Sequence, residues 1–144
     1  MEKENKRKLW ALVVDDDVDI RGLLVQILES LSFTCVVSGK LIEAKGKAKN
    51  QKFDIIFLDM RLEQGSGEDI LEMIRSESSG FNVVSPVVVV SGFLDPELVT
   101  RLAEKVSDII VKPFDVKTFT DRVNNVLLHP KKTLRMRMSE KSNS

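Results

Sequence analysis

The side chains in this sequence that could do chemistry share one feature: they come at the end of short apolar runs. They comprise carboxylates, one hydroxyl and one ammonium group: Asp15, Asp16 and Asp17 after residues 9–14, Asp59 after residues 53–58, Ser91 after residues 86–90, and Lys112 after residues 109–111. Taken alone, each of these residues is more often a turn residue or a helix cap than part of a site. The same placement after four separate runs favours a shared site.

The chemistry available to such a group is specific. Carboxylates gathered in a partly buried site repel one another, so they favour a cation between them. Mg²⁺ takes one or two protein carboxylates and keeps several waters, and Asp15 and Asp16 are its natural ligands. Asp59 is then a competent nucleophile for a phosphoryl group. The cation, the Lys112 ammonium and the Ser91 hydroxyl could neutralise the phosphoryl oxygens, because phosphoryl transfer depends mainly on positioning and charge.

Elements of alternating type must position these side chains. The apolar runs predict strands at residues 9–14, 33–37, 53–58, 86–90 and 109–111. Helical patterns lie between them, and the clearest places apolar residues on one face from Ile20 to Leu31. Capping residues mark the predicted helix starts: Asp17 or Asp19, Ser66, Asp95 before Pro96, and Asp115.

This alternation, repeated five times, predicts an α/β fold with a parallel sheet covered by helices on both faces. Residues 9–14, 53–58 and 86–90 are nearly all apolar, as strands buried on both faces require. Right-handed crossovers and short loops favour a flavodoxin-like, doubly wound (βα)5 fold with strand order 2-1-3-4-5. In such a sheet, groups beyond the carboxyl ends of the strands meet at one edge, so we expect the polar side chains to converge there.

Length and composition bound the remaining possibilities. The chain of 144 residues fits one domain, predicted at residues 9–129, between a polar tail at 1–8 and a basic tail at 130–144 that we expect to be disordered. The formal net charge of zero gives no reason to expect nucleic acid or membrane binding. The single cysteine excludes an internal disulfide, and the apolar stretch near the start is too short for a signal peptide, so we expect a cytoplasmic location.

Four segments together resemble the response-regulator receiver domains of two-component signalling, which are CheY-like. These segments are LVVDD at 12–16, IIFLD at 55–59, VVVVSG at 87–92 and IIVKPF at 109–114. The resemblance spans roughly residues 9–128 and implies a phosphoprotein that catalyses only its own phosphorylation and dephosphorylation, rather than an enzyme. It also implies a cis peptide bond between Lys112 and Pro113.

The resemblance implies a role for each residue of the expected site. Asp59 matches the phosphoacceptor, assisted by Ser91 and Lys112, while the ligands of Mg²⁺, or of Mn²⁺, are Asp15, Asp16, Asp59 and the backbone carbonyl of Arg61. Ser91 and Ile109 match the two switch positions, and Arg61 and Phe93 match positions that flank the phosphoryl group and tune its lifetime. Because both flanking side chains are bulky, we expect a long-lived phosphoryl group.

The resemblance implies phosphorylation by a histidine kinase or a histidine phosphotransfer protein. Because no output domain follows residue 130 in this sequence, we expect a stand-alone receiver, with a fragment of a longer regulator left open. It would signal through phosphorylation-dependent protein binding or a phosphorelay, as a monomer or a phosphorylation-dependent dimer. The downstream protein is expected on the face made by the fourth helix, the fifth strand and the fifth helix of the predicted fold.

Two alternatives remain open. The chain has Glu63 where the family commonly has proline, and Ile109 where it often has tyrosine or phenylalanine, so a degenerate receiver could act as a constitutive interaction module. The other alternative is a phosphatase with Asp15 as nucleophile. It rests on the Asp-x-Asp pattern that Asp15 and Asp17 form, which is similar to that of haloacid-dehalogenase-like enzymes.

Overall fold

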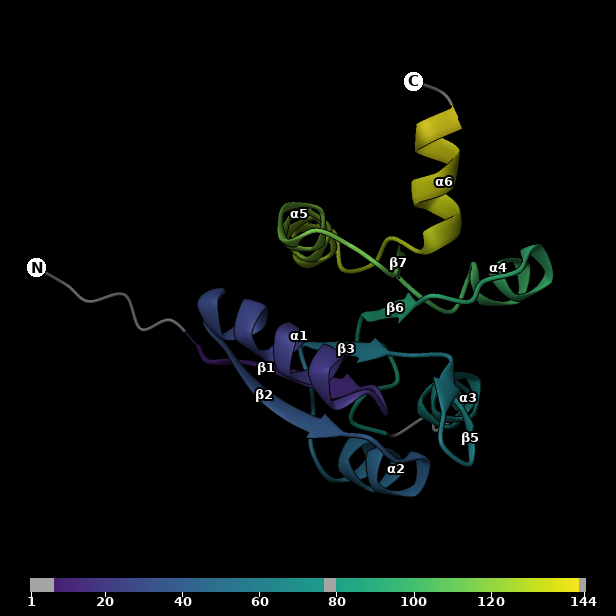
Figure 1. The fold of residues 1–144 in the computed structure, drawn as a ribbon. Coiled ribbons are helices and arrows are strands. Elements are labelled where there is room, and N and C mark those ends of the chain that lie inside the picture. The colour runs from purple at the N-terminus through teal and green to yellow at the C-terminus, as the bar shows by residue number, and fades with distance from the viewer. Residues whose placement is uncertain (1–6, 77–79, 143–144) are drawn as a thin grey trace, which may run out of the picture.

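Five parallel strands form the central sheet of the computed structural model, which describes residues 7–76 and 80–142 (Figure 1). They are β1 (Leu9–Val14), β2 (Phe33–Ser38), β3 (Ile55–Leu58), β6 (Val87–Ser91) and β7 (Asp108–Val111). Their order is β2-β1-β3-β6-β7. Counted along the chain, this is the predicted flavodoxin-like order 2-1-3-4-5, with the first and third strands side by side at the switch point.

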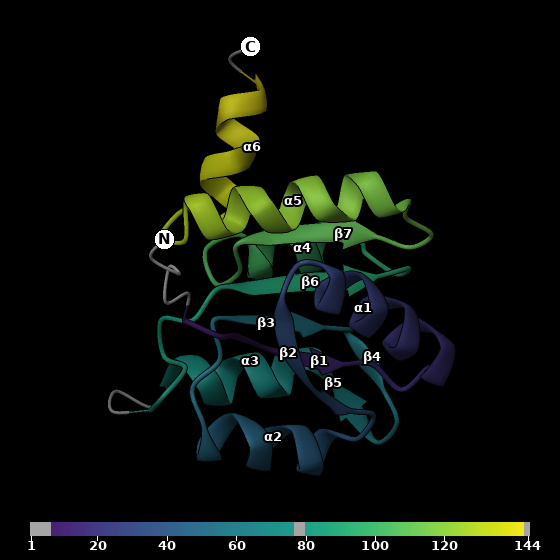
Figure 2. The same cartoon turned by 90° about the vertical axis from the view of Figure 1, so that its left-hand side faces the viewer.

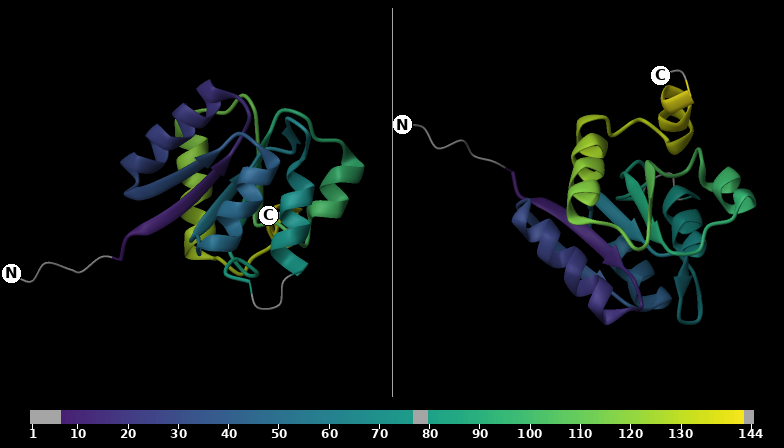
Figure 3. Two further views of the ribbon diagram at one scale, coloured as in Figure 1. Left: turned by 90° about the horizontal axis from the view of Figure 1, so that it is seen from below. Right: turned by 45° about the horizontal axis from the view of Figure 1, so that its top comes forward.

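The helices cover both faces of this sheet (Figure 3). They are α1 (Val18–Ser30), α2 (Leu41–Asn50), α3 (Gly67–Ser76), α4 (Pro96–Leu102), α5 (Val116–Leu128) and α6 (Leu134–Ser142). Side chains of α1 and α5 share one hydrophobic cluster, and those of α2, α3 and α4 share the other. Among the described residues, no helix is long and apolar enough to cross a membrane.

The strands are apolar because consecutive side chains enter opposite clusters. In β1, Ala11 and Val13 pack under α1 and α5, whereas Leu12 and Val14 pack under α2, α3 and α4, and all four are buried. This alternation follows from the two-residue period of a strand. A sheet buried on both faces fixes its register tightly, and the register in turn places the strand ends that carry the polar residues.

Helix starts follow the predicted capping residues. Asp17 accepts hydrogen bonds from the backbone N–H groups of Asp19 and Ile20 at the start of α1. Asp95 caps α4 directly before Pro96, and Asp115 caps α5. Each cap satisfies backbone donors that the first helical turn leaves unpaired.

The segment between β3 and α3 is more ordered than the turn predicted there. Strands β4 (Arg61–Leu62) and β5 (Gly65–Ser66) form a small antiparallel hairpin. The predicted helix cap, Ser66, pairs with Arg61 in this hairpin, although its hydroxyl also accepts a hydrogen bond from the Glu68 N–H. Gly67 begins α3 where a Cβ atom would lie 2.3 Å from the Asp59 carbonyl oxygen, so only glycine fits this close approach.

The prediction of a disordered tail at residues 130–144 is wrong for residues 134–142, which form α6. Figure 2 shows α6 projecting from the β7 edge of the domain. Its first residue, Leu134, is buried in the cluster beneath α4, and the backbone N–H groups of Leu134 and Arg135 donate to the carbonyls of Val106 and Ala103. The tail was expected to be disordered because it is polar, and it is ordered because a few of its residues reach back to the domain.

Arg137 fastens α6 to the strand and helix beside it. Its guanidinium donates to the carbonyl of Ser107 at 2.7 Å, to the carbonyl of His129 at 3.1 Å and to the side chain of Asn125. The whole residue is 8% exposed, so these hydrogen bonds are shielded from water. The fixed fork of a guanidinium suits this arrangement, in which one acceptor lies just before β7 and two lie at the end of α5.

We expect Arg137→Ala to release α6 from the domain. The substitution removes three hydrogen bonds of a charged, buried group and should lower the free energy of unfolding in urea by about 2 kcal/mol. Hydrogen exchange of the α6 amides should accelerate more than that of the sheet. Arg135→Ala is the matched control, since Arg135 makes only an exposed ion pair with Glu104 through its side chain. Unchanged α6 protection in Arg137→Ala would show that the contacts of Leu134 and Arg135 hold the helix without Arg137.

Candidate functional site

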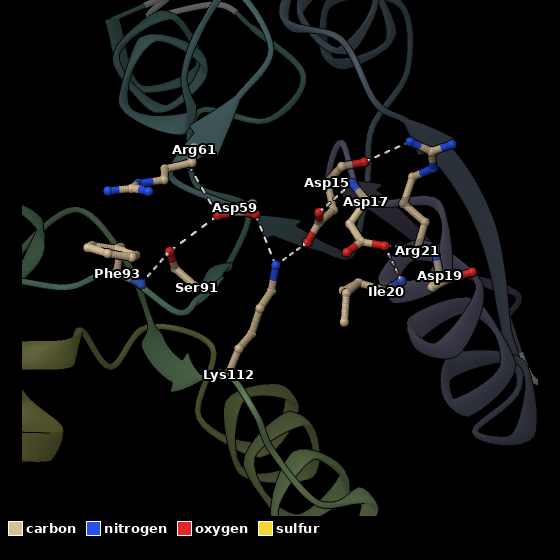
Figure 4. A network of polar contacts seen from close by, with 10 residues as sticks. All are labelled: Asp15, Asp17, Asp19, Ile20, Arg21, Asp59, Arg61, Ser91, Phe93 and Lys112. Atoms are coloured by element: carbon tan, nitrogen blue, oxygen red, sulfur yellow. Dashed lines mark hydrogen bonds and ion pairs between the residues drawn. The ribbon is translucent and has the colours of Figure 1, made fainter.

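The carboxyl ends of four neighbouring strands bring the predicted polar side chains together (Figure 4). Asp15 follows β1, Asp59 follows β3, Ser91 ends β6 and Lys112 follows β7. These strands are parallel and in register, with Val14 beside Leu58 and Ser91 beside Val111. The prediction that the polar groups converge at one edge is confirmed.

Lys112 joins two of the strand ends through its ammonium group. The Nζ atom lies 2.6 Å from Asp15 Oδ2 and 2.9 Å from Asp59 Oδ2. Both carboxylates are almost fully buried, with Asp15 at 1% exposure and Asp59 at 7%. The single cation thus compensates two acids that would be costly to bury unpaired.

The second carboxylate oxygen of Asp59 faces the opposite side of the site. Its Oδ1 atom accepts from the Ser91 hydroxyl at 3.2 Å and from the Arg61 backbone N–H at 3.1 Å. Ser91 is itself buried, and its hydroxyl accepts from the Phe93 N–H at 3.4 Å. Asp59 is therefore held in one orientation by donors from three segments of the chain.

The pKa values of the site reflect competition between burial and pairing. Burial raises the pKa of Asp15 above its ordinary value, and hydrogen bonds from Lys112 and the Asp17 N–H only partly offset this effect. Burial would lower the pKa of Lys112, but its hydrogen bonds to Asp15 and Asp59 outweigh burial and raise the pKa instead. Lys112 is thus held in its charged form.

The arrangement of oxygens fits a hard divalent cation. Carboxylate oxygens of Asp15, Asp16 and Asp59 all lie within 4.8 Å of one another. Oxygen-only donors suit Mg²⁺ or Mn²⁺. The three carboxylates exceed the charge of the Lys112 ammonium group, which is paired with two of them, Asp15 and Asp59. Asp16 is the exposed member, on the side of the cluster that solvent reaches.

Asp17 has a different role from its two neighbours. Its carboxylate caps α1, and its backbone N–H donates to Asp15 Oδ1 at 2.9 Å. A side chain that caps a helix is not placed to act as a general acid or base beside Asp15. Asp17 therefore cannot serve as the second acid of the Asp-x-Asp pattern on which the phosphatase alternative rests.

Arg61, in β4, and Phe93, in the loop after β6, lie next to this site. The guanidinium carbon of Arg61 is 3.5 Å from the centre of the Phe93 ring, which is the geometry of a cation–π contact. Both side chains are exposed, so the stack forms at the solvent side of Asp59. The resemblance placed both residues near the phosphoryl position, but the contact between them was not predicted.

Three further predictions concern the Lys112–Pro113 peptide bond, the switch position Ile109 and the backbone of Arg61. The Lys112–Pro113 peptide bond is cis, as predicted. Ile109 lies in β7, partly buried against the cluster beneath α2, α3 and α4. Arg61 donates its backbone N–H to Asp59, and its carbonyl stays a predicted metal ligand. Arg21 was missed, and it donates to the Asp15 carbonyl at 2.8 Å.

Comparison with known proteins now identifies the class. The response regulator receiver domain family matches residues 11–124, and the chain belongs to this family. The fold agrees, because a CheY-like receiver domain protein from Methanospirillum hungatei JF-1 superposes with a TM-score of 0.78 at 21% identity, covering 85% of this chain and 96% of that one. The protein is thus a receiver domain of the two-component response-regulator type.

Two other relatives are informative. The DNA-binding response regulator MtrA of Mycobacterium tuberculosis is 29% identical over 113 residues, which cover 78% of this chain and 47% of MtrA. The receiver domain of the sensor histidine kinase PA1611 from Pseudomonas aeruginosa PAO1, with a magnesium ion coordinated in the active site cleft, has a TM-score of 0.73 at 19% identity. That match covers 84% of this chain and 98% of the PA1611 domain.

These comparisons bear on two expectations about partners. The chain spans about half the length of the curated relatives it matches, so its stand-alone character stays a prediction. The expectation that no nucleic acid is involved finds no support, since relatives such as MtrA are DNA-binding proteins.

The excess of negative charge at the site predicts an effect on stability. In the presence of a chelator, Asp16→Asn should raise the melting temperature by roughly 3 °C, because it removes one of three mutually repelling carboxylates without changing side-chain volume. Asp19→Asn is the control, since Asp19 is an exposed acid outside the carboxylate cluster and should give no such rise. A lower melting temperature for Asp16→Asn would mean that Lys112 already neutralises the cluster.

Proposed function

We propose that Asp59 accepts a phosphoryl group from a phosphohistidine in a Mg²⁺-dependent reaction. The donor would be a histidine kinase or a histidine phosphotransfer protein. One observation carries the proposal: the buried Asp59 carboxylate lies between the Lys112 ammonium and the Ser91 hydroxyl, with the Asp15 and Asp16 oxygens in reach of a shared cation. The family of the chain supports the same assignment.

Asp15, Asp16, Asp59 and the Arg61 carbonyl would hold the Mg²⁺ ion. When bound, the ion supplies positive charge against the oxygens of the phosphoryl group. The set of donors on three acidic residues supports this assignment, and the PA1611 receiver domain, which has a magnesium ion in its active site cleft, offers a precedent. Mn²⁺ would be accepted at the same oxygens.

The proposed transfer is a single displacement at phosphorus. An Asp59 oxygen attacks the phosphorus, a P–O bond forms, and the P–N bond breaks so that its electron pair returns to the imidazole of the donor. In the new acyl phosphate the negative charge lies on the phosphoryl oxygens, which are farther from the Asp59 backbone than the carboxylate oxygens were. Lys112 and Ser91 contact the two Asp59 oxygens and are therefore positioned to follow that charge. The chain would catalyse only this step and its hydrolysis.

The readout would be a change in protein binding at the face made by α4, β7 and α5. Ser91 connects the phosphorylated residue to this face, because β6 carries Ser91 at its end and pairs with β7 along its length. Val111 and Val116 are exposed near the carboxyl end of β7 and offer apolar contact area there. The docked α6 occupies the opposite end of the same face, so a partner would contact the end nearer Lys112.

A constitutive interaction module is the second candidate. It is favoured by Ile109, whose aliphatic side chain packs against the core where an aromatic ring would otherwise switch position. The phosphatase alternative is disfavoured, because Asp17, the second acid of its Asp-x-Asp pattern, caps α1.

Incubation with Mg²⁺ and acetyl phosphate tests the proposal. Intact-mass measurement should show the gain of one phosphoryl group in the wild type and none in Asp59→Asn or in the presence of EDTA. Asp17→Asn is the matched control, because asparagine also caps helices and the variant should be phosphorylated normally.

The possible outcomes separate the three candidates. Phosphorylation that survives Asp59→Asn but not Asp15→Asn would support the phosphatase-like assignment. No phosphorylation of the wild type, together with partner binding that Asp59→Asn leaves unchanged, would support the constitutive module.

The Arg61–Phe93 stack predicts a slow loss of the phosphoryl group. We expect the stacked side chains, which lie on the solvent side of Asp59, to hinder water from reaching the acyl phosphate, so Arg61→Ala and Phe93→Ala should each accelerate dephosphorylation several-fold. Because the two groups form one contact, the double variant should lose its phosphoryl group little faster than either single variant. Decay is followed by mass after removal of acetyl phosphate. A wild type that loses the group within seconds would contradict the prediction.

A further inference from the structure

The backbone of Asp15 is fixed on both sides of its α-carbon by contacts outside β1. Its N–H donates to the carbonyl of Ser38 at the end of β2, at 3.1 Å. Its carbonyl accepts from Nη1 of Arg21 in α1, at 2.8 Å (Figure 4). The loop that begins with Asp15 and Asp16 is therefore held between the neighbouring strand and the helix that follows it.

Gly39 provides the space in which the Arg21 guanidinium lies. A Cβ atom at Gly39 would be 2.2 Å from Arg21 Nη1 and 3.3 Å from its Cζ, far closer than ordinary contact. The backbone of Gly39 has no positive φ angle, so alanine could adopt the same conformation. Glycine is thus needed here for room beside Arg21, and not for an unusual backbone conformation.

Asp16 depends on this backbone support more than Asp15 does. The Asp15 side chain is anchored by Lys112 and by the Asp17 N–H. The Asp16 side chain is exposed, and within the described part of the chain no hydrogen bond or ion pair fixes it. Its carboxylate is placed only by the backbone between the Asp15 carbonyl, which Arg21 holds, and the Asp17 cap of α1.

We propose that Arg21, seated against Gly39, is a positioning residue for the cation-binding loop of Asp15 and Asp16. The proposal deepens the proposed function and rests on it. Arg21 binds the carbonyl and leaves the carboxylate oxygens to the cation, so its positive charge orders the loop without occupying the ligands. Residues that orient metal ligands in this way typically change metal affinity tenfold to a hundredfold when they are replaced.

Titration of the full chain with Mg²⁺ alone by calorimetry tests this role. Arg21→Ala removes the contact, and Gly39→Ala displaces the flexible end of Arg21 while Arg21 itself remains. Each should weaken Mg²⁺ binding by about tenfold. Because both changes break the same hydrogen bond, the double variant should bind Mg²⁺ no more weakly than either single variant. Gly22→Ala in α1 is the matched control, since a Cβ atom there meets nothing within 4 Å.

A kinetic readout separates positioning from a general loss of structure. The Mg²⁺ concentration that gives half-maximal phosphorylation by acetyl phosphate should rise about tenfold in Arg21→Ala, while the rate at saturating Mg²⁺ stays near that of the wild type. Urea unfolding in a chelator should show that the variants remain folded. A fall in the saturating rate with unchanged Mg²⁺ affinity would overturn the proposal.

The failure of this inference can be told from the failure of the proposed function. If the wild type binds Mg²⁺ and Asp16→Asn does not, the cation site stands. Wild-type affinity in Arg21→Ala and Gly39→Ala, or losses that add in the double variant, then overturn the positioning role alone. If the wild type binds no Mg²⁺, the loop has no cation site for Arg21 to position, and both proposals fall.

Discussion

The ion pairs of Lys112 with Asp15 and Asp59 are the interaction on which the site depends. Two carboxylates that are nearly inaccessible to water lie at the ends of adjacent strands, where burying two like charges without a cation would be costly. One ammonium group from β7 contacts both. That contact requires β1, β3, β6 and β7 to end at the same edge, so the strand order and register serve the site as much as the core.

Much of this could be predicted from the sequence, because the polar residues follow apolar runs and parallel strands align their carboxyl ends. The positions of Asp59, Ser91 and Lys112 needed only the strand pattern and the rule that sites form beyond the carboxyl ends of a doubly wound sheet. The capping residues Asp17, Asp95 and Asp115 could be predicted equally well, because a capping side chain accepts hydrogen bonds from the first turn of the helix that directly follows it. Local chemistry and sheet topology thus account for the positions of the proposed ligands and nucleophile.

What could not be predicted comes from contacts between segments that no local pattern links. Arg21 reads as one more polar residue on α1 until the fold places it beside Gly39 and the Asp15 carbonyl. The Arg61–Phe93 stack joins β4 to the loop after β6, and Gly67 is required only because α3 starts against the Asp59 carbonyl. Sequence pattern finds groups that do the chemistry, whereas the residues that hold those groups in place emerge from tertiary packing.

The C-terminal segment restrains the α4–β7–α5 face despite its polar composition. Arg137 contacts Ser107 just before β7 as well as Asn125 and His129 at the end of α5, and Arg122 of α5 pairs with Asp108 at 3.0 Å. The end of the α4–β7–α5 face away from the site is therefore tied down by buried, charged hydrogen bonds. If Ser91 transmits a rearrangement, as proposed, the freer part of this face is the opposite end, near Lys112, where Val111 and Val116 are exposed. The docked helix thus restricts where the face can move, because a buried guanidinium cannot give up its partners without loss.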